Sequence, residues 1–158
     1  MIRRVRYALM FGGLANFLAL YYVQPLLPGI AARFGVSPAE STAALSLTTI
    51  TMALALLFVG PISDMTGRVA IMRASLLGSA VLGIAGAFAP TWHALLVLRA
   101  LEGIALAGLP AVALAYLREE TPPHAHVRAN ATFVMGTAAG GALGRLLPGP
   151  VHALWGWQ

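Results

Sequence analysis

Residues 41–59 read STAALSLTTITMALALLFV and carry no charged side chain. A helix rises about 1.5 Å per residue, so a run of this length matches a hydrocarbon layer about 30 Å thick. Lipid offers the backbone no hydrogen-bond partner, and a segment that crosses it must pair its own N–H and C=O groups as a helix. The stretch therefore predicts a membrane-spanning helix.

Apolar runs of the same kind lie on both sides of this stretch. The whole sequence is 59% hydrophobic and only 9% charged, whereas soluble proteins are about 25% charged. We predict five spans, at about residues 7–30, 41–59, 69–88, 92–117 and 127–147. The predicted fold class is an all-α membrane protein in which residues 1–158 form a single transmembrane domain.

Two further features of the sequence support the second span and set the orientation of the domain. Ser37 and Glu40 have the spacing of a capping box, and Pro38 falls at the first helical position, where its missing N–H costs nothing. Arginines gather on one side of the predicted spans, at Arg3, Arg4, Arg6, Arg68, Arg73, Arg118 and Arg128, and Arg33 stands alone on the other side. Because cytoplasmic loops are enriched in arginine, we predict a multi-pass membrane protein with a cytoplasmic N-terminus. Trp92, Trp155 and Trp157 are expected at the outer interface.

Several other classes of function find no support in the sequence. The arginines form no basic stripe with interleaved aromatic residues, so nucleic acid is not an expected partner. Cysteine is absent, which excludes disulfides and thiolate metal sites. His124 and His126 have no third histidine or carboxylate beside them, and no nucleotide-binding or hydrolase motif occurs. We therefore predict no metal, no cofactor and no enzymatic activity.

Between the second and third predicted spans the sequence reads GPISDMTGR, residues 60–68. Gly60 is expected to let the end of the helix turn tightly, and Gly67 tolerates a positive φ. Asp64 is expected near the N-terminal end of the next helix, where a carboxylate is stabilised, and Arg68 can pair with Asp64. The simplest interpretation is a short turn that joins two helices.

The spacing of Gly60, Asp64, Gly67 and Arg68 resembles the signature between helices two and three of the major facilitator superfamily. The resemblance implies a transporter of two six-helix halves, with this chain forming most of the N-terminal six-helix bundle. It also implies that residues 60–68 act as a gate latch against the other half. Met65 and Val69 stand where the family usually has basic residues, which implies a weaker latch.

The fourth predicted span contains two ionisable side chains, Arg99 and Glu102. They lie one helical turn apart, so they share a face and can pair. The segment from Arg99 to Ala107 is similar to the fourth-helix motif of the same superfamily, in which glutamine is commoner at the position of Glu102. Ionisable groups inside a membrane are candidate functional sites, so proton coupling by this pair is one interpretation. A static ion pair that orients helices is the other.

The fifth predicted span carries Gly136, Gly140 and Gly144 on one face, and small residues let helices approach closely. The pattern resembles the fifth-helix motif of antiporters in this superfamily, with Gly141 in place of a proline and Arg145 in place of the last glycine. The alternative for the glycines is a packing seam alone. Arg145 lies near the end of the span, where a long side chain is able to reach the interface.

The segments at residues 22–28, 99–103 and 140–146 look most like a bacterial branch of arabinose-efflux and drug-efflux permeases. This resemblance implies a secondary transporter in the lipid bilayer that exports a small organic solute or drug against protons by alternating access. The first span contains a few polar side chains among its apolar ones: Asn16, Tyr21, Tyr22 and Gln24. They line a substrate path or else bond to neighbouring helices.

Five spans place the C-terminus outside, and the chain stops at Gln158, where a sixth span is expected to begin. Because the superfamily has two six-helix halves, the alternative hypothesis is a truncated fragment that inserts in the membrane without transporting alone. Its C-terminal half is then a missing partner. A small transporter assembled from several copies of this chain is a third hypothesis.

Overall fold

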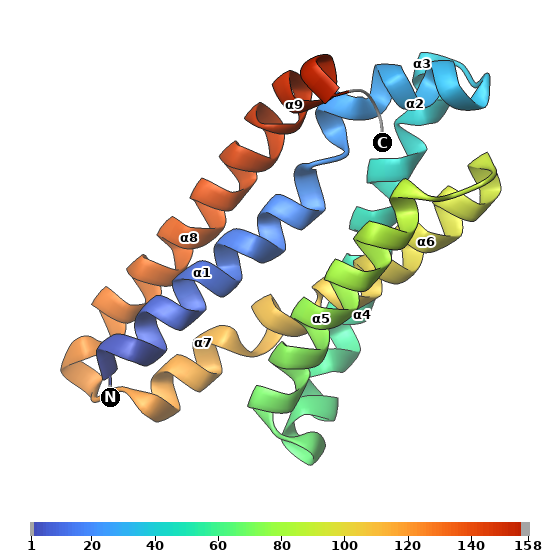
Figure 1. Ribbon diagram of the computed structural model, residues 1–158. Helices are drawn as coiled ribbons and strands as arrows, with labels where there is room; N and C mark the ends of the chain where they lie inside the picture. The colour runs from blue at the N-terminus through green and yellow to red at the C-terminus, as the bar shows by residue number, and fades with distance from the viewer. Residues whose placement is uncertain (1, 156–158) are drawn as a thin grey trace.

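The computed structural model describes residues 2–155, with side chains described as far as Val151, and the described part is helical throughout (Figure 1). The elements are α1 Ile2–Tyr21, η1 Gln24–Leu26, α2 Leu27–Phe34, α3 Pro38–Ser41, α4 Ala43–Thr66, α5 Arg68–Ala87, α6 Trp92–Leu106, α7 Gly108–Glu120, η2 Pro123–Ala125, α8 His126–Leu146 and α9 Pro148–Trp155. The predicted all-α fold class is confirmed. The Trp155 side chain and Trp157, which we expected at an interface, lie outside the described residues.

Four stretches are long and apolar enough to cross a membrane: Ile2–Phe34, Pro38–Thr66, Arg68–Ala87 and Trp92–Glu120. α8 is the fifth long helix and is not among them, because glycines, threonines and Arg145 dilute its apolar side chains. The predicted architecture of five long helices is thus present, with α8 as its least apolar member.

The first stretch begins earlier than predicted and is not one continuous helix. α1 starts at Ile2 and ends at Tyr21, and the chain then passes through η1 into α2. Pro25 has no N–H to donate to the Tyr21 carbonyl, so the α-helical pattern stops there. α2 ends at Phe34, and the C-cap Gly35 that follows has a φ of 65°, the left-handed conformation that glycine adopts without strain.

The predicted turn at Gly60 is wrong. α4 continues through Gly60 and Pro61 to Thr66, and the chain reverses only at Gly67, which has a φ of 91°. Side-chain hydroxyls support the last turns of the helix, since Ser63 Oγ donates to the Gly60 carbonyl at 2.8 Å. At the other end of the span the capping box of Ser37 and Glu40 is present, and it caps the short α3 rather than α4 itself.

The fourth stretch is divided at Ala107 into α6 and α7. Pro110 leaves the Leu106 carbonyl without its usual donor, and this accounts for the break. The two parts remain a single path across the bundle, since Ala111 N–H donates to the Ala107 carbonyl at 3.2 Å.

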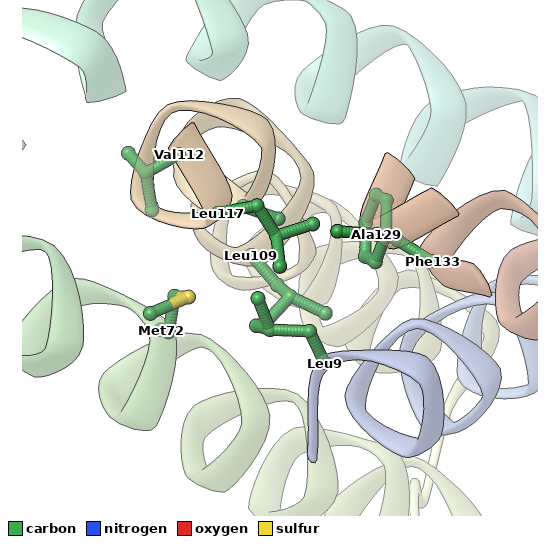
Figure 2. Packing of buried hydrophobic residues seen from close by; sticks show 8 residues of the cluster. Leu9, Met72, Leu109, Val112, Leu117, Ala129 and Phe133 are labelled. Carbon is green, nitrogen blue, oxygen red and sulfur yellow. The ribbon is translucent and has the colours of Figure 1, made fainter. Parts of the chain in front are cut away.

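The long helices pack in two main pairs. α1 and α8 lie side by side and run in the same direction (Figure 1), and α4 lies along α6. α5 packs against both α6 and α7. Where α1, α5, α7 and α8 meet, an apolar cluster fills the interior (Figure 2); it consists of Leu9, Met72, Leu109, Val112, Ala113, Leu117, Ala129 and Phe133.

The two ends of the bundle contain different elements. The Gly67 end contains the start of α1, the α4–α5 turn, the end of α7 and the start of α8. The Gly35 end contains η1, α2, α3, the α5–α6 turn and α9. At the Gly35 end, Arg33 ties α2 to the α5–α6 turn by donating to the carbonyls of Ala87 and Ala89 at 3.4 and 3.3 Å.

Candidate functional site

Arg99 and Glu102 form an ion pair in the interior of the bundle. Arg99 Nη1 lies 2.6 Å from Glu102 Oε2, and each side chain is only 1% exposed. Both come from α6, one turn apart, so helical geometry alone brings them together. Removing two charges from solvent is costly, and such a pair is stable only when the remaining polar atoms also find partners.

The guanidinium of Arg99 finds these partners on two other helices. Its Nη2 donates to the Leu20 carbonyl in the last turn of α1 at 3.2 Å, and its Nε donates to the Ala44 carbonyl of α4 at 3.3 Å. The Tyr22 ring lies over the same group, with its centroid 5.2 Å from Cζ. Because α1 ends at Tyr21, its last carbonyls lack donors within the helix and are available to Arg99. The buried cation thus holds three spans together.

Glu102 has a different environment. Its Oε2 accepts from Arg99, whereas its Oε1 is buried and has no hydrogen-bond partner among the described residues. A Cβ added at Gly83 of α5 would lie 3.4 Å from this Oε1 and 3.8 Å from the Tyr22 hydroxyl oxygen. A proton on Oε1 would remove the charge of the carboxylate without displacing any hydrogen bond that the structure shows.

The approach of α4 to α6 depends on Gly103, beside the ion pair. A Cβ at Gly103 would overlap the Thr48 carbonyl and the Thr51 hydroxyl. That hydroxyl also bridges to α6 by donating to the Ala100 carbonyl at 2.8 Å. Thr48 is fully buried and bonds back to the Ala44 carbonyl of its own helix. Of these two threonines, only Thr51 is shown to bond to α6 through its side chain.

The polar residues of the first span occupy three different environments. Asn16 is fully buried on α1, and neither atom of its amide group has a partner among the described residues. Tyr22 lies beside the ion pair. Tyr21 and Gln24 contact Arg145 of α8, whose Nε donates to Gln24 Oε1 at 3.0 Å and whose Cζ is 4.0 Å from the Tyr21 ring centroid. No pattern in the sequence indicated this contact with Arg145.

Arg68, at the start of α5, bonds to two carboxylates at the Gly67 end. Its Nη2 is 3.5 Å from Asp64 Oδ1, the partner expected from the sequence. A closer partner is Glu119 of α7, at 2.8 Å from Nη2, and Arg68 Nε donates to both oxygens of that carboxylate. Sequence reasoning missed Glu119. The acidic pair Glu119–Glu120 next to Arg118 was the available indication.

The glycines of α8 lie directly on the backbone of α1. A Cβ at Gly136 would overlap the Met10 carbonyl, one at Gly140 the Leu14 carbonyl, and one at Gly144 would lie 2.9 Å from the Leu18 carbonyl oxygen. The contacts advance by four residues on each helix, which is the register of a small-residue seam between parallel helices. Gly141 faces the Tyr21 ring at 3.6 Å, an ordinary contact distance.

The family model described as the Major Facilitator Superfamily matches residues 9–158. The uncharacterized MFS-type transporter YybF of Bacillus subtilis is 39% identical over 156 residues, which cover 99% of this chain and 39% of that protein. The inner membrane transport protein YnfM of Escherichia coli is 39% identical over 155 residues, or 98% of this chain and 37% of the relative.

A more distant relative is the multidrug resistance protein MdtG of Proteus mirabilis, 30% identical over 155 residues, which cover 95% of this chain and 38% of that protein. The chain therefore spans between 37% and 39% of the length of these curated relatives. No solved structure matches it.

Proposed function

Because the chain is a multi-pass membrane protein that belongs to the major facilitator superfamily, we propose that it works within a secondary transporter that couples proton entry to the efflux of a small organic solute or drug. Membership of this superfamily also means that the chain is not an enzyme. We propose that the transporter belongs to the arabinose-efflux and drug-efflux branch and that its solute is of the class which that branch exports. The resemblance to a relative named as a multidrug resistance protein supports this proposal.

The observation that carries the proposal is the buried pair of Arg99 and Glu102 with one carboxylate oxygen unpaired. Glu102 takes up a proton on Oε1, and the charge that Arg99 balances then disappears. Arg99 donates hydrogen bonds to carbonyls of α1 and α4. Loss of the negative charge that balances Arg99 therefore acts on the contacts among three spans. Ionisable residues inside transporters commonly serve as proton relays in this way.

The outer parts of the molecule have separate proposed roles. Gly60, Asp64, Gly67 and Arg68 form the gate segment, and Glu119 is added to it through its bonds with Arg68. Asn16, Tyr21, Tyr22 and Gln24 are the proposed substrate path. The glycine seam of α8 with Gly141 and Arg145 fixes the α1–α8 pair and corresponds to the antiporter-like motif.

We further propose that the Gly67 end is cytoplasmic and that the protein resides in the bacterial inner membrane. Arg3, Arg4, Arg68 and Arg118 lie at this end, where the positive-inside tendency favours them. The relative named as an inner membrane transport protein agrees with this location. A tag at the C-terminus accessible only from outside supports the orientation, and one accessible only from the cytoplasm contradicts it.

The test is solute-dependent proton flux in proteoliposomes with an imposed pH gradient and a panel of drugs and sugars. The chain is assayed alone and together with the whole remainder of the Escherichia coli relative, beyond the part that this chain matches, because it spans only 37% of that protein. Flux from the combined preparation alone favours the alternative that the chain is a fragment which inserts but does not transport by itself. Absence of flux from both preparations contradicts the proposal.

A further inference from the structure

Two consecutive tyrosines where the first helix ends each lie against an arginine of another helix. The Tyr22 ring has its centroid 5.2 Å from Cζ of Arg99 on α6. The Tyr21 ring, on the last residue of α1, has its centroid 4.0 Å from Cζ of Arg145 on α8. The two arginines therefore have similar aromatic neighbours, but they differ in how their charge is balanced.

Arg99 has a carboxylate partner from its own chain, because its Nη1 lies 2.6 Å from Glu102 Oε2. In the described part of the chain, no carboxylate oxygen lies within 4.0 Å of an Arg145 nitrogen. Arginines in membrane-spanning helices are costly and usually have a counter-ion, so each one without a partner is a candidate functional residue. Arg145 is such a residue.

The Arg145 guanidinium is held in one orientation by α1. Its Nε donates to Gln24 Oε1 at 3.0 Å, and the Tyr21 ring supports the plane of the group. The ring itself packs on α8, since a Cβ at Gly141 would lie 3.6 Å from it. Among the residues whose side chains are described, none accepts a hydrogen bond from Arg145 Nη1 or Nη2, and the side chain is exposed. The Nη edge of the guanidinium is thus open to a ligand.

This open edge selects an anionic group. Two N–H donors of a guanidinium bind both oxygens of a carboxylate, or two oxygens of a phosphate, and these charge-assisted bonds are stronger than those to a neutral acceptor. A planar group that is already oriented loses little conformational freedom when it binds. The contacts with Tyr21 and Gln24 therefore prepare Arg145 for an anion that the described part of the chain does not supply.

We propose that Arg145, held by Tyr21 and Gln24, binds the anionic group of the transported solute, a carboxylate or a phosphate. The inference rests on the proposed transport function and narrows its solute class to small organic anions. Bound solute gives Arg145 the partner that Glu102 gives Arg99, and the two sites adjoin at the end of α1. The phosphate of a lipid headgroup has the same chemistry, so the two sources must be separated by experiment.

Binding is tested by nuclear magnetic resonance of the chain with isotope-labelled arginine, in nanodiscs of zwitterionic lipid. The probes are acetate, benzoate and inorganic phosphate, and benzyl alcohol is the neutral control. We expect at least one anion to move the Nε–H signal of Arg145 to saturation, and benzyl alcohol to leave it in place. Arg145→Gln identifies the signal by its loss.

Arg33 is the matched internal control, because it lies at the same end of the bundle and its Nη1 and Nη2 donate to the carbonyls of Ala87 and Ala89. Its signal, identified with Arg33→Gln, should move much less than that of Arg145. An Arg145 signal that none of the anions moves overturns the proposal. So does an Arg145 signal that moves no more than the Arg33 signal.

The same signal separates a solute from a lipid headgroup. The titration is repeated in nanodiscs that contain anionic phosphatidylglycerol, and we expect the response of Arg145 to the anions to persist there. A signal that phosphatidylglycerol alone displaces, and that no longer responds to the anions, assigns the site to a lipid headgroup. That result overturns the solute as its ligand.

The absent carboxylate can also be built into the chain. Gln24→Glu places one where the amide oxygen now lies 3.0 Å from Arg145 Nε. We expect the dissociation constant of the bound anion to rise at least about tenfold, because Arg145 then has an internal partner. Gln24→Met removes only the acceptor and should raise it less. Unchanged affinity in Gln24→Glu contradicts the site. These measurements require no flux, so failure of the anion site and failure of the proposed transport are separate results.

Discussion

Two arginine–carboxylate pairs lie in different parts of the molecule. Arg99 and Glu102 are 2.6 Å apart in the interior, and Arg68 and Glu119 are 2.8 Å apart at the Gly67 end. The N–O distances of the two pairs are similar. The side chains of Arg99 and Glu102 are each 1% exposed, whereas those of Arg68 and Glu119 are 24% and 53% exposed. The environment of a pair, rather than its distance, therefore decides what the pair can do.

The inner pair is a fixed part of the fold. Loss of one partner leaves a charge in a medium that cannot solvate it, so the pair breaks only when the carboxylate becomes neutral. The outer pair is open to water, which replaces its bonds at little cost. Such a pair suits a contact that forms and separates as a gate moves, whereas the inner pair suits a site that responds to a proton.

The largest effect is expected when the inner pair loses its cation. Arg99→Gln removes the charge that balances Glu102 together with the bonds to α1 and α4. We expect a loss of about 3–5 kcal/mol in the free energy of unfolding. Denaturant titration of the purified chain measures it. The double variant Arg99→Met/Glu102→Leu is the control and should recover most of the loss, because no unpaired charge remains. A double variant as unstable as Arg99→Gln contradicts this explanation.

If burial decides how much a contact stabilises the fold, a buried contact without charge should also contribute more to the free energy of unfolding than the outer pair does. Gly140→Ala forces a Cβ into the Leu14 carbonyl, so α1 and α8 must separate. We expect a loss of about 1–3 kcal/mol, the usual range for overpacking. The neighbouring Gly141→Ala is the matched control, since its Cβ meets the Tyr21 ring at 3.6 Å and fits. Equal losses in the two variants would contradict the seam as the cause, because helix propensity favours alanine over glycine at both positions.

Part of this arrangement was predictable because it depends on local sequence. Apolar runs indicate spans, and spacing along one helix brings Arg99 to Glu102 and places Gly136, Gly140 and Gly144 on one face. The capping box of Ser37 and Glu40 is equally local.

The remaining features depend on contacts between distant segments or on local energies that nearly balance. Glu119 reaches Arg68 from a different span, and Arg145 reaches Tyr21 and Gln24 across 121 positions or more of sequence. α4 passes through Pro61, and the Ser63 hydroxyl donates to the Gly60 carbonyl near the end of the same helix. Gly60 and Gly67 were both candidates for the turn, and the local sequence did not decide between them.

The outer pair should show a smaller effect that is sensitive to salt. Glu119→Gln removes the bidentate contact with Arg68. We expect little change in the unfolding midpoint, because water replaces the lost hydrogen bonds at this exposed position. At about 1 M salt, where the Debye length is about 3 Å, even this difference should disappear. Titrations at low and high salt measure it. A loss as large as that in Arg99→Gln would mean that the outer pair is also a fixed part of the fold.

The smallest effect is expected at Asp64. Its oxygen is 3.5 Å from Arg68 Nη2, and the side chain is 68% exposed. Asp64→Asn should therefore leave the unfolding midpoint within error of the unchanged chain. Combined with Glu119→Gln in a double-mutant cycle, it should give additive changes. Strong coupling between the two variants would show that Arg68 depends on both carboxylates together.

The most direct measurement compares Glu102→Gln with Glu119→Gln in the assay of solute-dependent proton flux. Both substitutions remove one carboxylate that binds an arginine, one inside the bundle and one at its end. We predict that Glu102→Gln abolishes the flux, whereas Glu119→Gln changes its rate through the gate segment without abolishing it, because only the inner carboxylate takes up the coupled proton. Flux that persists in Glu102→Gln would contradict the assignment of this pair as the proton-coupling site.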